Sequence, residues 1–248
     1  MIIPTHTRKI GSEVEKILLK NKLVLGTSLG LVKKTNEDQI GYTIPKNKPN
    51  TVRICVADGH WGSTASKKII KFWLNENLNF PINRESAITT TQHIEKKLFK
   101  SFGKENMNEQ TDLTPEGAFT VCEINKLNQL TVVSYGDCRL LIANKQRIKY
   151  QLLTQSTWLG AFSSLGLRNR IPVEKALVFE TYQLQLEDYL LLFTDGVDEC
   201  VYNKPTIKPE QLAQLTKKVE PETIFDSIFK QVFLYGAEDN VSLGIFKL

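Results

Sequence analysis

The sequence has few histidines and cysteines and no long apolar run. Among 248 residues there are three histidines and four cysteines, and no two cysteines have the close spacing of zinc or redox motifs. We therefore expect four reduced thiols in the core, as is typical of a cytoplasmic protein. No stretch approaches the ~20 consecutive apolar residues that a membrane span needs. Charges interrupt the N-terminal stretch MIIPTHTRKIGSEVEKILLK too often for a signal peptide.

Concentrated positive charge, which nucleic-acid binding needs, is also absent. The net charge is +5, but the lysines are scattered, as in KKTNED, SKKIIK and EKKLFK, and do not alternate with aromatic residues. A solvated lysine-rich surface explains them, so we predict no nucleic-acid partner. With 41% hydrophobic and 24% charged residues, the chain can bury one large core. We expect one main domain and a monomer.

Groups of strand patterns alternate with pairs of helix patterns. Alternating and β-branched residues predict three strands at 22–30, 38–44 and 51–58, followed by two helices at 63–78 and 85–102. The next strand patterns are 118–124, 129–135, 139–145 and 148–153, which predict an antiparallel meander. Two more strands are expected at 177–186 and 188–195, two helices at 209–218 and 221–234, and a last strand at 241–248. Residues 11–20 predict a short leading helix. This order favours an α+β protein with layered sheets over a doubly wound fold.

Six acidic residues stand at the ends of these predicted elements. They are Glu37, Asp38, Asp58, Asp137, Asp195 and Asp239. Each alone is typical of a turn, where Asp is favoured for its backbone geometry. Asp58 and Asp195 end strongly apolar runs, however, so their carboxylates are expected where strands of a common core converge. A cluster of carboxylates does not stay ionised without a compensating cation.

The ligand types favour a hard metal ion. Carboxylates, carbonyls and water suit magnesium or manganese, and His6 and His93 stand in no metal-like spacing. The chain has no GxxxxGK[ST] loop, no GxSxG elbow and no cysteine-dependent phosphatase motif. What remains is metal-activated water. In a two-metal site a bridging hydroxide can attack phosphorus in line, and His60, next to the cluster, could protonate the leaving oxygen.

An ordered set of motifs resembles the metal-dependent Ser/Thr protein phosphatases of the 2C type, the PPM family. The motifs are LGLVKKTNEDQ, VADGHWGSTAS, GAFTVCEI, SYGDCRLLI, LLLFTDGVDE and EDNVSLGIF, in the order of the family. The resemblance covers residues 23–248 and leaves 1–22 as an N-terminal helical extension. It implies two antiparallel sheets packed as a sandwich and flanked by helix pairs, with four layers in the order αββα. The implied activity is hydrolysis of phosphoserine or phosphothreonine in a phosphoprotein substrate.

The resemblance also implies a role for each acidic residue. Asp58 would bridge two manganese or magnesium ions, with Glu37 and the carbonyl of Gly59 on one ion and Asp195 and Asp239 on the other. Asp38 would orient a metal-bound water, and Asp137 would help to hold a third ion. Asn240 matches the family's DN pair.

Three features depart from the family pattern. Lys33 stands where the family usually has an arginine that binds the substrate phosphate, and a lysine offers a point charge in place of a planar fork. Trp61 stands where a small residue is usual, and we expect Trp61 and Trp158 to pack inside the protein rather than contact substrate. The flap is shortened to residues 154–170.

Two alternatives stay open beside the active phosphatase. The short flap resembles that of bacterial phosphatases that act on phosphoserine in partner-switching regulation. Lys33 and the flap also fit a regulatory relative that binds phosphoproteins with weak or no catalysis. Because every acidic metal ligand of the family is present, the sequence favours an active enzyme.

Overall fold

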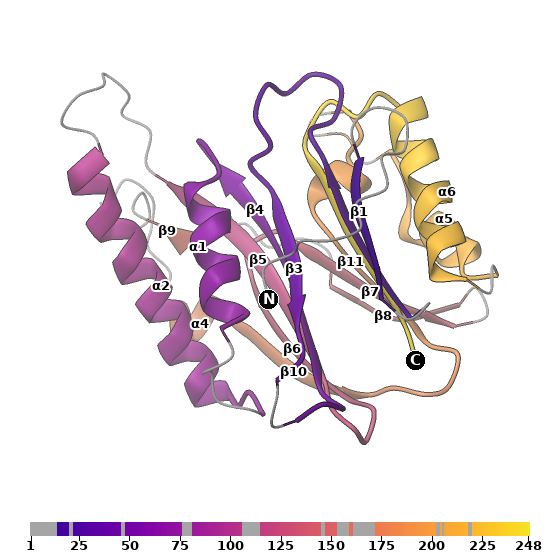
Figure 1. The fold of residues 1–248 in the computed structure, drawn as a ribbon, viewed down its shortest axis with the longest axis horizontal. Helices are drawn as coiled ribbons and strands as arrows, with labels where there is room; N and C mark the ends of the chain where they lie inside the picture. Colours follow the sequence, from indigo (N-terminus) through magenta and orange to yellow (C-terminus); the bar gives the residue numbers. More distant parts are fainter. Residues whose placement is uncertain are drawn as a thin grey trace.

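The computed structural model describes most of the chain. The described residues are 14–19, 22–45, 48–75, 81–105, 115–144, 147–152, 159–160, 172–201, 204, 206–217 and 220–248. Over these ranges, two antiparallel sheets pack face to face, and helices cover the outer face of each (Figure 1). The predicted α+β sandwich is confirmed. None of the helices in these ranges is long and apolar enough to cross a membrane.

Each sheet has six strands in the described part of the chain. The first has the order β1 (Val14–Leu19), β2 (Leu23–Ser28), β12 (Val241–Lys247), β11 (Tyr189–Phe193), β7 (Arg139–Asn144) and β8 (Arg147–Leu152). The second has the order β10 (Val178–Gln183), β6 (Gln129–Tyr135), β5 (Glu116–Ile124), β4 (Val52–His60) and β3 (Gln39–Thr43), and the short β9 (Leu159–Gly160) pairs with β5. All of these pairings are antiparallel.

Helices form the two outer layers. The helices next to the second sheet are α1 (Thr64–Trp73), α2 (Arg84–Glu105) and α4 (Val173–Ala176). The first sheet is covered by α5 (Pro209–Leu215) and α6 (Pro221–Leu234), and a 3₁₀ turn, η1 (Asp195–Val197), follows β11.

Central strands bury both faces, which explains their continuous apolar sequence. In β4, Ile54 and Val56 belong to the core between the sheets, whereas Cys55 and Ala57 pack under the helices α1 and α2. Successive side chains of a strand point to opposite faces of the sheet. One residue of each adjacent pair in β4 therefore packs between the sheets, and the other packs under the helices. All four cysteines are buried and unbridged, as predicted, and burial raises the pKa of each thiol.

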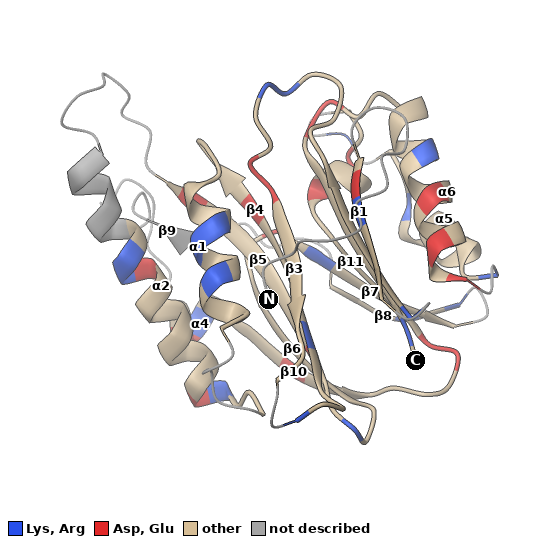
Figure 2. Cartoon of the chain, viewed as in Figure 1, with Lys and Arg blue, Asp and Glu red and all other residues tan. Residues whose placement is uncertain are grey.

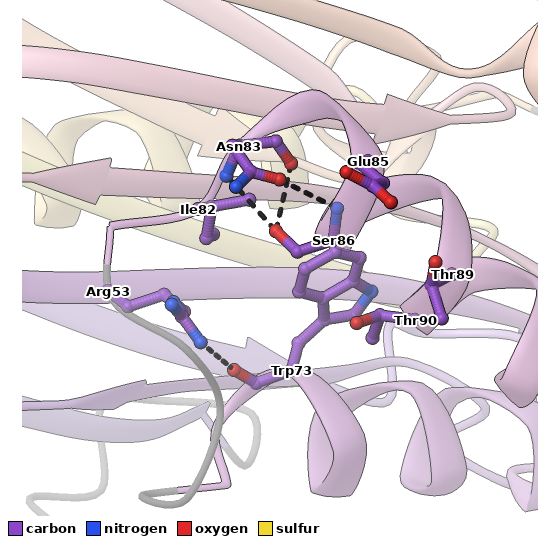
Figure 3. Close-up of a pocket in the computed structure, with 8 residues that line it drawn as sticks. All are labelled: Arg53, Trp73, Ile82, Asn83, Glu85, Ser86, Thr89 and Thr90. Carbon is purple, nitrogen blue, oxygen red and sulfur yellow. Dashed lines mark hydrogen bonds between the residues drawn. The ribbon is translucent and has the colours of Figure 1, made fainter.

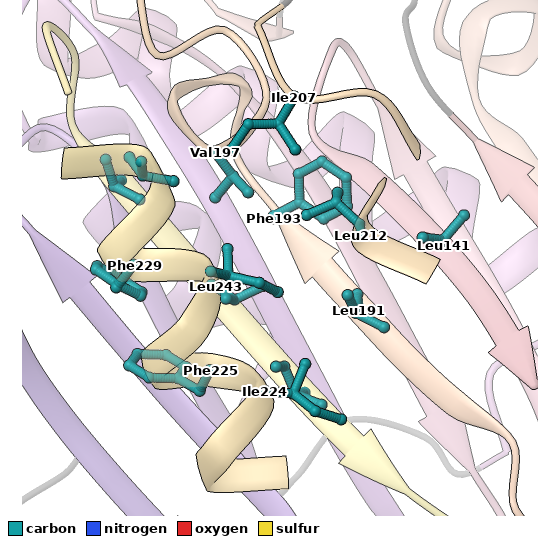
Figure 4. Close-up of a cluster of buried hydrophobic side chains, with 14 of the residues drawn as sticks. Leu141, Leu191, Phe193, Val197, Ile207, Leu212, Ile224, Phe225, Phe229 and Leu243 are labelled. Carbon is teal, nitrogen blue, oxygen red and sulfur yellow. The ribbon is translucent and has the colours of Figure 1, made fainter. Parts of the chain in front are cut away.

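The helix α6 forms the core on the outer face of the first sheet (Figure 4). Its residues Ile224, Phe225, Ile228, Phe229 and Val232 are buried at helical spacing. They contact side chains of β11 and β12, and burial of each such side chain contributes about 1.5–3 kcal/mol. The ring of Phe225 fills the space over the backbone of β2, where Gly26 leaves room for it.

Two predictions about chain path are wrong. The expected leading helix is strand β1, which pairs with β2 through all six residues, so the chain from Val14 belongs to the sandwich and is not a helical extension. Lys16 of β1 is buried and its Nζ lies 2.8 Å from Glu222 and 2.7 Å from Asp226 of α6. The expected meander is also interrupted, because β6 and β7 lie in different sheets. The turn between them carries Asp137 from one sheet to the other.

A buried ion pair joins the second sheet to its helices. Arg53 of β4 is fully buried, and its Nε and Nη2 lie 3.0 and 2.5 Å from Oε2 of Glu123 in β5. Its Nη1 donates to the carbonyl of Trp73, the last residue of α1, at 3.0 Å (Figure 3). The other oxygen of Glu123 accepts the backbone N–H of Ile82 at 3.0 Å, just before α2. One ion pair therefore fixes the end of α1 and the entry to α2.

A cavity of about 380 Å³ lies beside this ion pair, next to the first turn of α2 (Figure 3). At its edge, Asn83 and Ser86 cap the helix reciprocally, with Ser86 N–H donating to Asn83 Oδ1 at 2.8 Å and Asn83 N–H donating to Ser86 Oγ at 3.0 Å. Arg53 is near the start of β4 and Asp58 is near its end, so this cavity is separate from the predicted acidic site.

The substitution Glu123→Gln should strongly destabilise the protein, because it leaves the Arg53 charge buried without its counter-ion. We expect the free energy of unfolding in urea to fall by about 3–5 kcal/mol. The double variant Arg53→Met/Glu123→Leu should recover part of this loss. Glu85→Gln, at an exposed position of α2, is the control and should change stability by less than ~0.5 kcal/mol. A Glu123→Gln variant as stable as this control would contradict the assigned role.

Candidate active site

The predicted acidic residues meet at one edge of the sandwich. Asp58 is near the end of β4, Asp195 follows β11, and Asp239 lies just before β12. Glu37 and Asp38 directly precede β3, and Asp137 lies in the turn that crosses between the sheets. Figure 2 shows red acidic segments around the upper ends of the strands in that view. The charges of Asp38, Asp195, Asp137 and Asp239 all act on Asp58.

Burial and mutual repulsion make ionisation of these carboxyls costly. Asp38 is 1% exposed, and burial, with the charges of Asp195 and Asp239, raises its pKa to about 7. Burial, with the charges of Asp137 and Asp239, raises the pKa of Asp195 to about 7 as well. Burial and four neighbouring aspartates raise the pKa of Asp58 well above its usual value. A cation at this edge would relieve all three penalties.

The predicted ligands are oxygen donors, the type that hard divalent cations prefer. Over the described ranges, no three Asp, Glu, His or Cys side chains stand in an arrangement that could hold a metal ion. Magnesium commonly binds through one or two carboxylates with several waters, and carboxylate oxygens also suit manganese. The ligand types at this edge, all carboxylate or carbonyl oxygens, therefore agree with these ions, although their side chains are not arranged around a common metal position in the described part of this structure.

Glu37 is held by the loop that follows β4. One of its side-chain oxygens accepts the backbone N–H of Gly62, and its carbonyl accepts the hydroxyl of Ser66. Gly59 packs against the same carbonyl, since a Cβ there would lie 2.7 Å from the Glu37 oxygen. The close approach requires a glycine, and it brings Glu37 beside the end of β4.

Asn240 holds the loop before β3 from the other sheet. Its Oδ1 accepts the backbone N–H of Glu37 at 2.8 Å, and its Nδ2 donates to the carbonyls of Leu29 at 2.9 Å and Thr35 at 3.1 Å. The DN pair thus has a structural meaning: Asp239 belongs to the acidic edge, and Asn240 fixes the backbone of another acidic residue.

Thr194 positions Asp38 and was not predicted from the sequence. Its hydroxyl donates to Oδ2 of Asp38 at 2.7 Å and accepts the backbone N–H of Ser242 at 3.0 Å. Thr194 is fully buried. The only sequence signal was its place directly before Asp195, in a stretch where threonine is also a common strand residue.

His60 lies between two carboxylates. Its Nε2 is 3.6 Å from Oδ2 of Asp58, and its Nδ1 is 3.5 Å from Oε1 of Glu116. Burial opposes protonation of His60, but the hydrogen bond to Glu116 and the charges of Asp137, Glu116 and Asp195 raise its pKa. Sequence reasoning missed Glu116, because only the pairing of β4 with β5 brings it opposite His60.

Lys33 contacts the acidic edge directly. Its Nζ lies 2.9 Å from Oδ1 of Asp239 and 3.4 Å from Oε2 of Glu37. Burial opposes the charge of Lys33, but the hydrogen bond and charge of Asp239, followed by those of Glu37, raise its pKa. The ammonium group therefore acts as an internal counter-ion to two of the predicted metal ligands.

Arg139 has a supporting role that the sequence did not reveal. It is buried at the start of β7, and it forms ion pairs with Asp198 and with Glu199, the latter at 2.6 Å. These contacts tie the turn containing Asp137 to the segment after Asp195. The positive charge of Arg139 also lowers the pKa of Asp195, partly offsetting the larger effects of burial and acidic neighbours.

The structure overturns one expectation and leaves another untested. Trp61 was expected to pack inside the protein, but it is 60% exposed. Trp158 and all of the flap except residues 159–160 lie outside the described residues.

Comparison with solved structures shows the same fold in bacterial phosphatases. A bacterial serine phosphatase bearing an R161A mutation has a TM-score of 0.71 at 18% identity, over 96% of this chain and 99% of that one. The serine/threonine phosphatase PstP/Ppp of Mycobacterium tuberculosis has a TM-score of 0.67 at 16% identity, over 92% and 98%. A PstP catalytic domain in complex with two manganese ions gives 0.67 at 16% identity, over 91% and 97%. No curated protein matches this chain.

The sandwich of two antiparallel sheets between helices therefore has the fold of the PPM-type protein phosphatases. Within this class, the family model for Stage II sporulation protein E (SpoIIE) matches residues 93–248, more than half of the chain. The chain belongs to the SpoIIE family. The predicted resemblance to PPM phosphatases is confirmed.

Asp195→Asn should stabilise the metal-free protein at high pH. The raised pKa of Asp195 means that the folded state binds more protons than the unfolded state from the usual value of 3.8 up to about 7. Stability of the wild type in chelator should therefore fall as pH rises through this window. The variant lacks this contribution, so its melting temperature should fall less between about pH 5 and pH 8.

Glu187→Gln, at an exposed turn, is the control and should follow the wild-type pH dependence. The melting temperatures of all three proteins are measured by thermal unfolding in excess chelator across this pH range. If the melting temperatures of Asp195→Asn and the wild type fell equally with pH, the carboxyl of Asp195 would not have a raised pKa in the folded state.

Proposed function

We propose that the chain is a manganese- or magnesium-dependent protein phosphatase that hydrolyses phosphoserine and phosphothreonine. The observation that carries the proposal is the set of buried, mutually repelling carboxylates beside His60 and Lys33. In a loop with only a structural role, a cluster of buried carboxylates would lower the stability of the fold without any compensating function. Membership of the SpoIIE family and the fold shared with bacterial phosphatases support the same activity.

The metal ligands in this proposal are the acidic residues and one carbonyl. They are Glu37, Asp58, Gly59 through its carbonyl, Asp195 and Asp239, with Asp137 for a third, weaker ion. When bound, two divalent ions would activate a water for attack on phosphorus and neutralise the phosphate oxygens. The manganese complex of the PstP catalytic domain supports this choice of ion.

Asp38 is assigned to orient the attacking water. Its Oδ2 accepts the hydroxyl of Thr194, which holds the carboxyl in place within the core. Hydrogen bonding of this kind fixes a catalytic group within the small tolerance that proximity effects require.

His60 is assigned as the general acid. The hydrogen bond to Glu116 and the surrounding negative charge favour the imidazolium form, which is the form that donates a proton to the leaving serine oxygen. Glu116 also sets the ring orientation from β5. Glu116 is therefore a positioning residue for His60.

Lys33 is assigned to the substrate phosphate. Its contacts with Glu37 and Asp239 keep the ammonium group at the acidic edge. Cations that neutralise these two carboxylates would free it to bind a phosphate oxygen. A lysine attracts phosphate as a point charge but orients it less than the bidentate fork of an arginine.

A narrower form of the proposal is a bacterial phosphoserine phosphatase of partner-switching regulation. The family match to a bacterial sporulation protein and the similarity to a solved bacterial serine phosphatase favour phosphoserine as the substrate. The alternative of a regulatory protein without catalysis gains no support from the site, since all the predicted acidic ligands lie at the same edge.

The central test is hydrolysis of a phosphoserine peptide and of an aryl phosphate with and without manganese. We expect turnover in millimolar manganese or magnesium and its loss in excess chelator, because exchangeable ions bound by oxygen ligands are required. Asp195→Asn should abolish most of this turnover, whereas Glu187→Gln should retain it. Full wild-type activity in chelator would refute metal dependence, and no turnover with either ion would refute the activity.

The role of His60 is tested by leaving groups of different basicity. His60→Ala should lower turnover of a phosphoserine peptide by about 100-fold or more, and turnover of an activated aryl phosphate by less than ~10-fold. The physical reason is that an activated leaving group needs little protonation. His93→Ala, at an exposed position of α2 where the imidazole contacts the ring of Phe72, is the matched control. Equal losses on both substrates would assign His60 a positioning role instead.

A further inference from the structure

Trp61 has an unusual combination of exposure and backbone conformation. Its side chain is 60% exposed, and its φ angle is 63°, in the left-handed region that bulky residues rarely adopt. It directly follows His60 and precedes Gly62. A glycine at position 61 would adopt this conformation without strain, so the tryptophan is an unfavourable choice for the fold alone.

The surrounding contacts impose this conformation. The backbone N–H of Gly62 donates to the Glu37 side chain, and Gly59 is packed against the Glu37 carbonyl. The loop is therefore held on both sides of Trp61 by one predicted metal ligand. Strained conformations persist where neighbouring contacts determine them, and they concentrate at functional sites.

The residue that follows Trp61 has open space beside it, since a Cβ placed on Gly62 would meet no atom of the described residues within 4 Å. Leu31 and Val32 are 55% and 65% exposed on the loop that carries Lys33. Lys33 and Gly62 contact the two different oxygens of the Glu37 carboxylate, which places the two loops on either side of it.

We propose that Trp61 is a specificity-determining residue that contacts an apolar side chain next to the phosphoserine of the substrate. This inference rests on the proposed function and specifies its substrate class. Apolar neighbours are favoured because Trp61 on one loop and Leu31 and Val32 on the other expose apolar side chains. Burial of an apolar side chain against an exposed indole removes apolar surface of both partners from water.

The test compares two phosphoserine peptides that differ only in the residues flanking the phosphoserine, with leucine in one and glycine in the other. The wild type in manganese should have a kcat/KM about tenfold or more higher for the leucine peptide. Trp61→Asn removes the ring but tolerates the left-handed conformation, so the loop keeps its shape. This variant should bring the ratio of the two kcat/KM values close to one, and Trp61→Phe should keep most of the preference.

Leu186→Ala is the matched control, since Leu186 is 78% exposed in the turn before β11, at the opposite end of that strand from Asp195. It should leave the ratio unchanged. A second readout is stability: Trp61→Gly should raise the melting temperature by about 2–4 °C, because it relieves backbone strain. If Trp61→Asn leaves the ratio of the two kcat/KM values unchanged while the wild type still hydrolyses aryl phosphate, the inference is overturned and the proposed function stands. A wild type that hydrolyses none of these substrates would overturn both.

Discussion

The repulsion among buried carboxylates at one edge of the sandwich is the constraint on which the site depends. Asp38, Asp58 and Asp195 are placed there by strands or strand ends of both sheets, and burial raises the pKa of each. Without a cation, the folded state must either take up protons or bear the repulsion. Lys33 is an internal counter-ion to Glu37 and Asp239, and Arg139 lowers the pKa of Asp195, so cations from solution would have to balance only the remaining charge.

The rest of the structure resists this repulsion through contacts between distant segments. Asn240 fixes the loop of Glu37 from the opposite sheet, and Thr194 holds Asp38. Arg139 joins the crossover turn to the segment after β11. Each contact joins segments that are far apart in the sequence, so the site is assembled only when the complete sandwich has formed. Such preorganisation is what electrostatic catalysis requires, since the donors then need little rearrangement during the reaction.

Stability and function are in opposition at this edge. The like-charged carboxylates and the left-handed backbone of Trp61 cost folding free energy, and both lie where the proposed substrate would bind. The two helix-covered cores extend mainly away from this edge, and the Arg53–Glu123 ion pair lies near the opposite end of β4 from Asp58. Functional sites commonly retain such unfavourable features, because substitutions that remove them for stability also remove the groups that the function needs.

The amino-acid sequence by itself determined the class of fold, most elements and the identity of the acidic residues. Apolar periodicity and motif order are local properties, so they were sufficient to predict the strands from β2 onward except the short β9, the helix pairs and the six acidic residues at element ends. The segment 11–20 was mistaken for a helix because its charges and leucines fit both periods, and pairing with β2 decided the outcome. Only the tertiary structure placed β6 and β7 in different sheets, brought Glu116 opposite His60, set Thr194 against Asp38 and left Trp61 exposed. The physical reason is that strand pairing and burial depend on residues far apart in the chain, whose contacts no local pattern encodes.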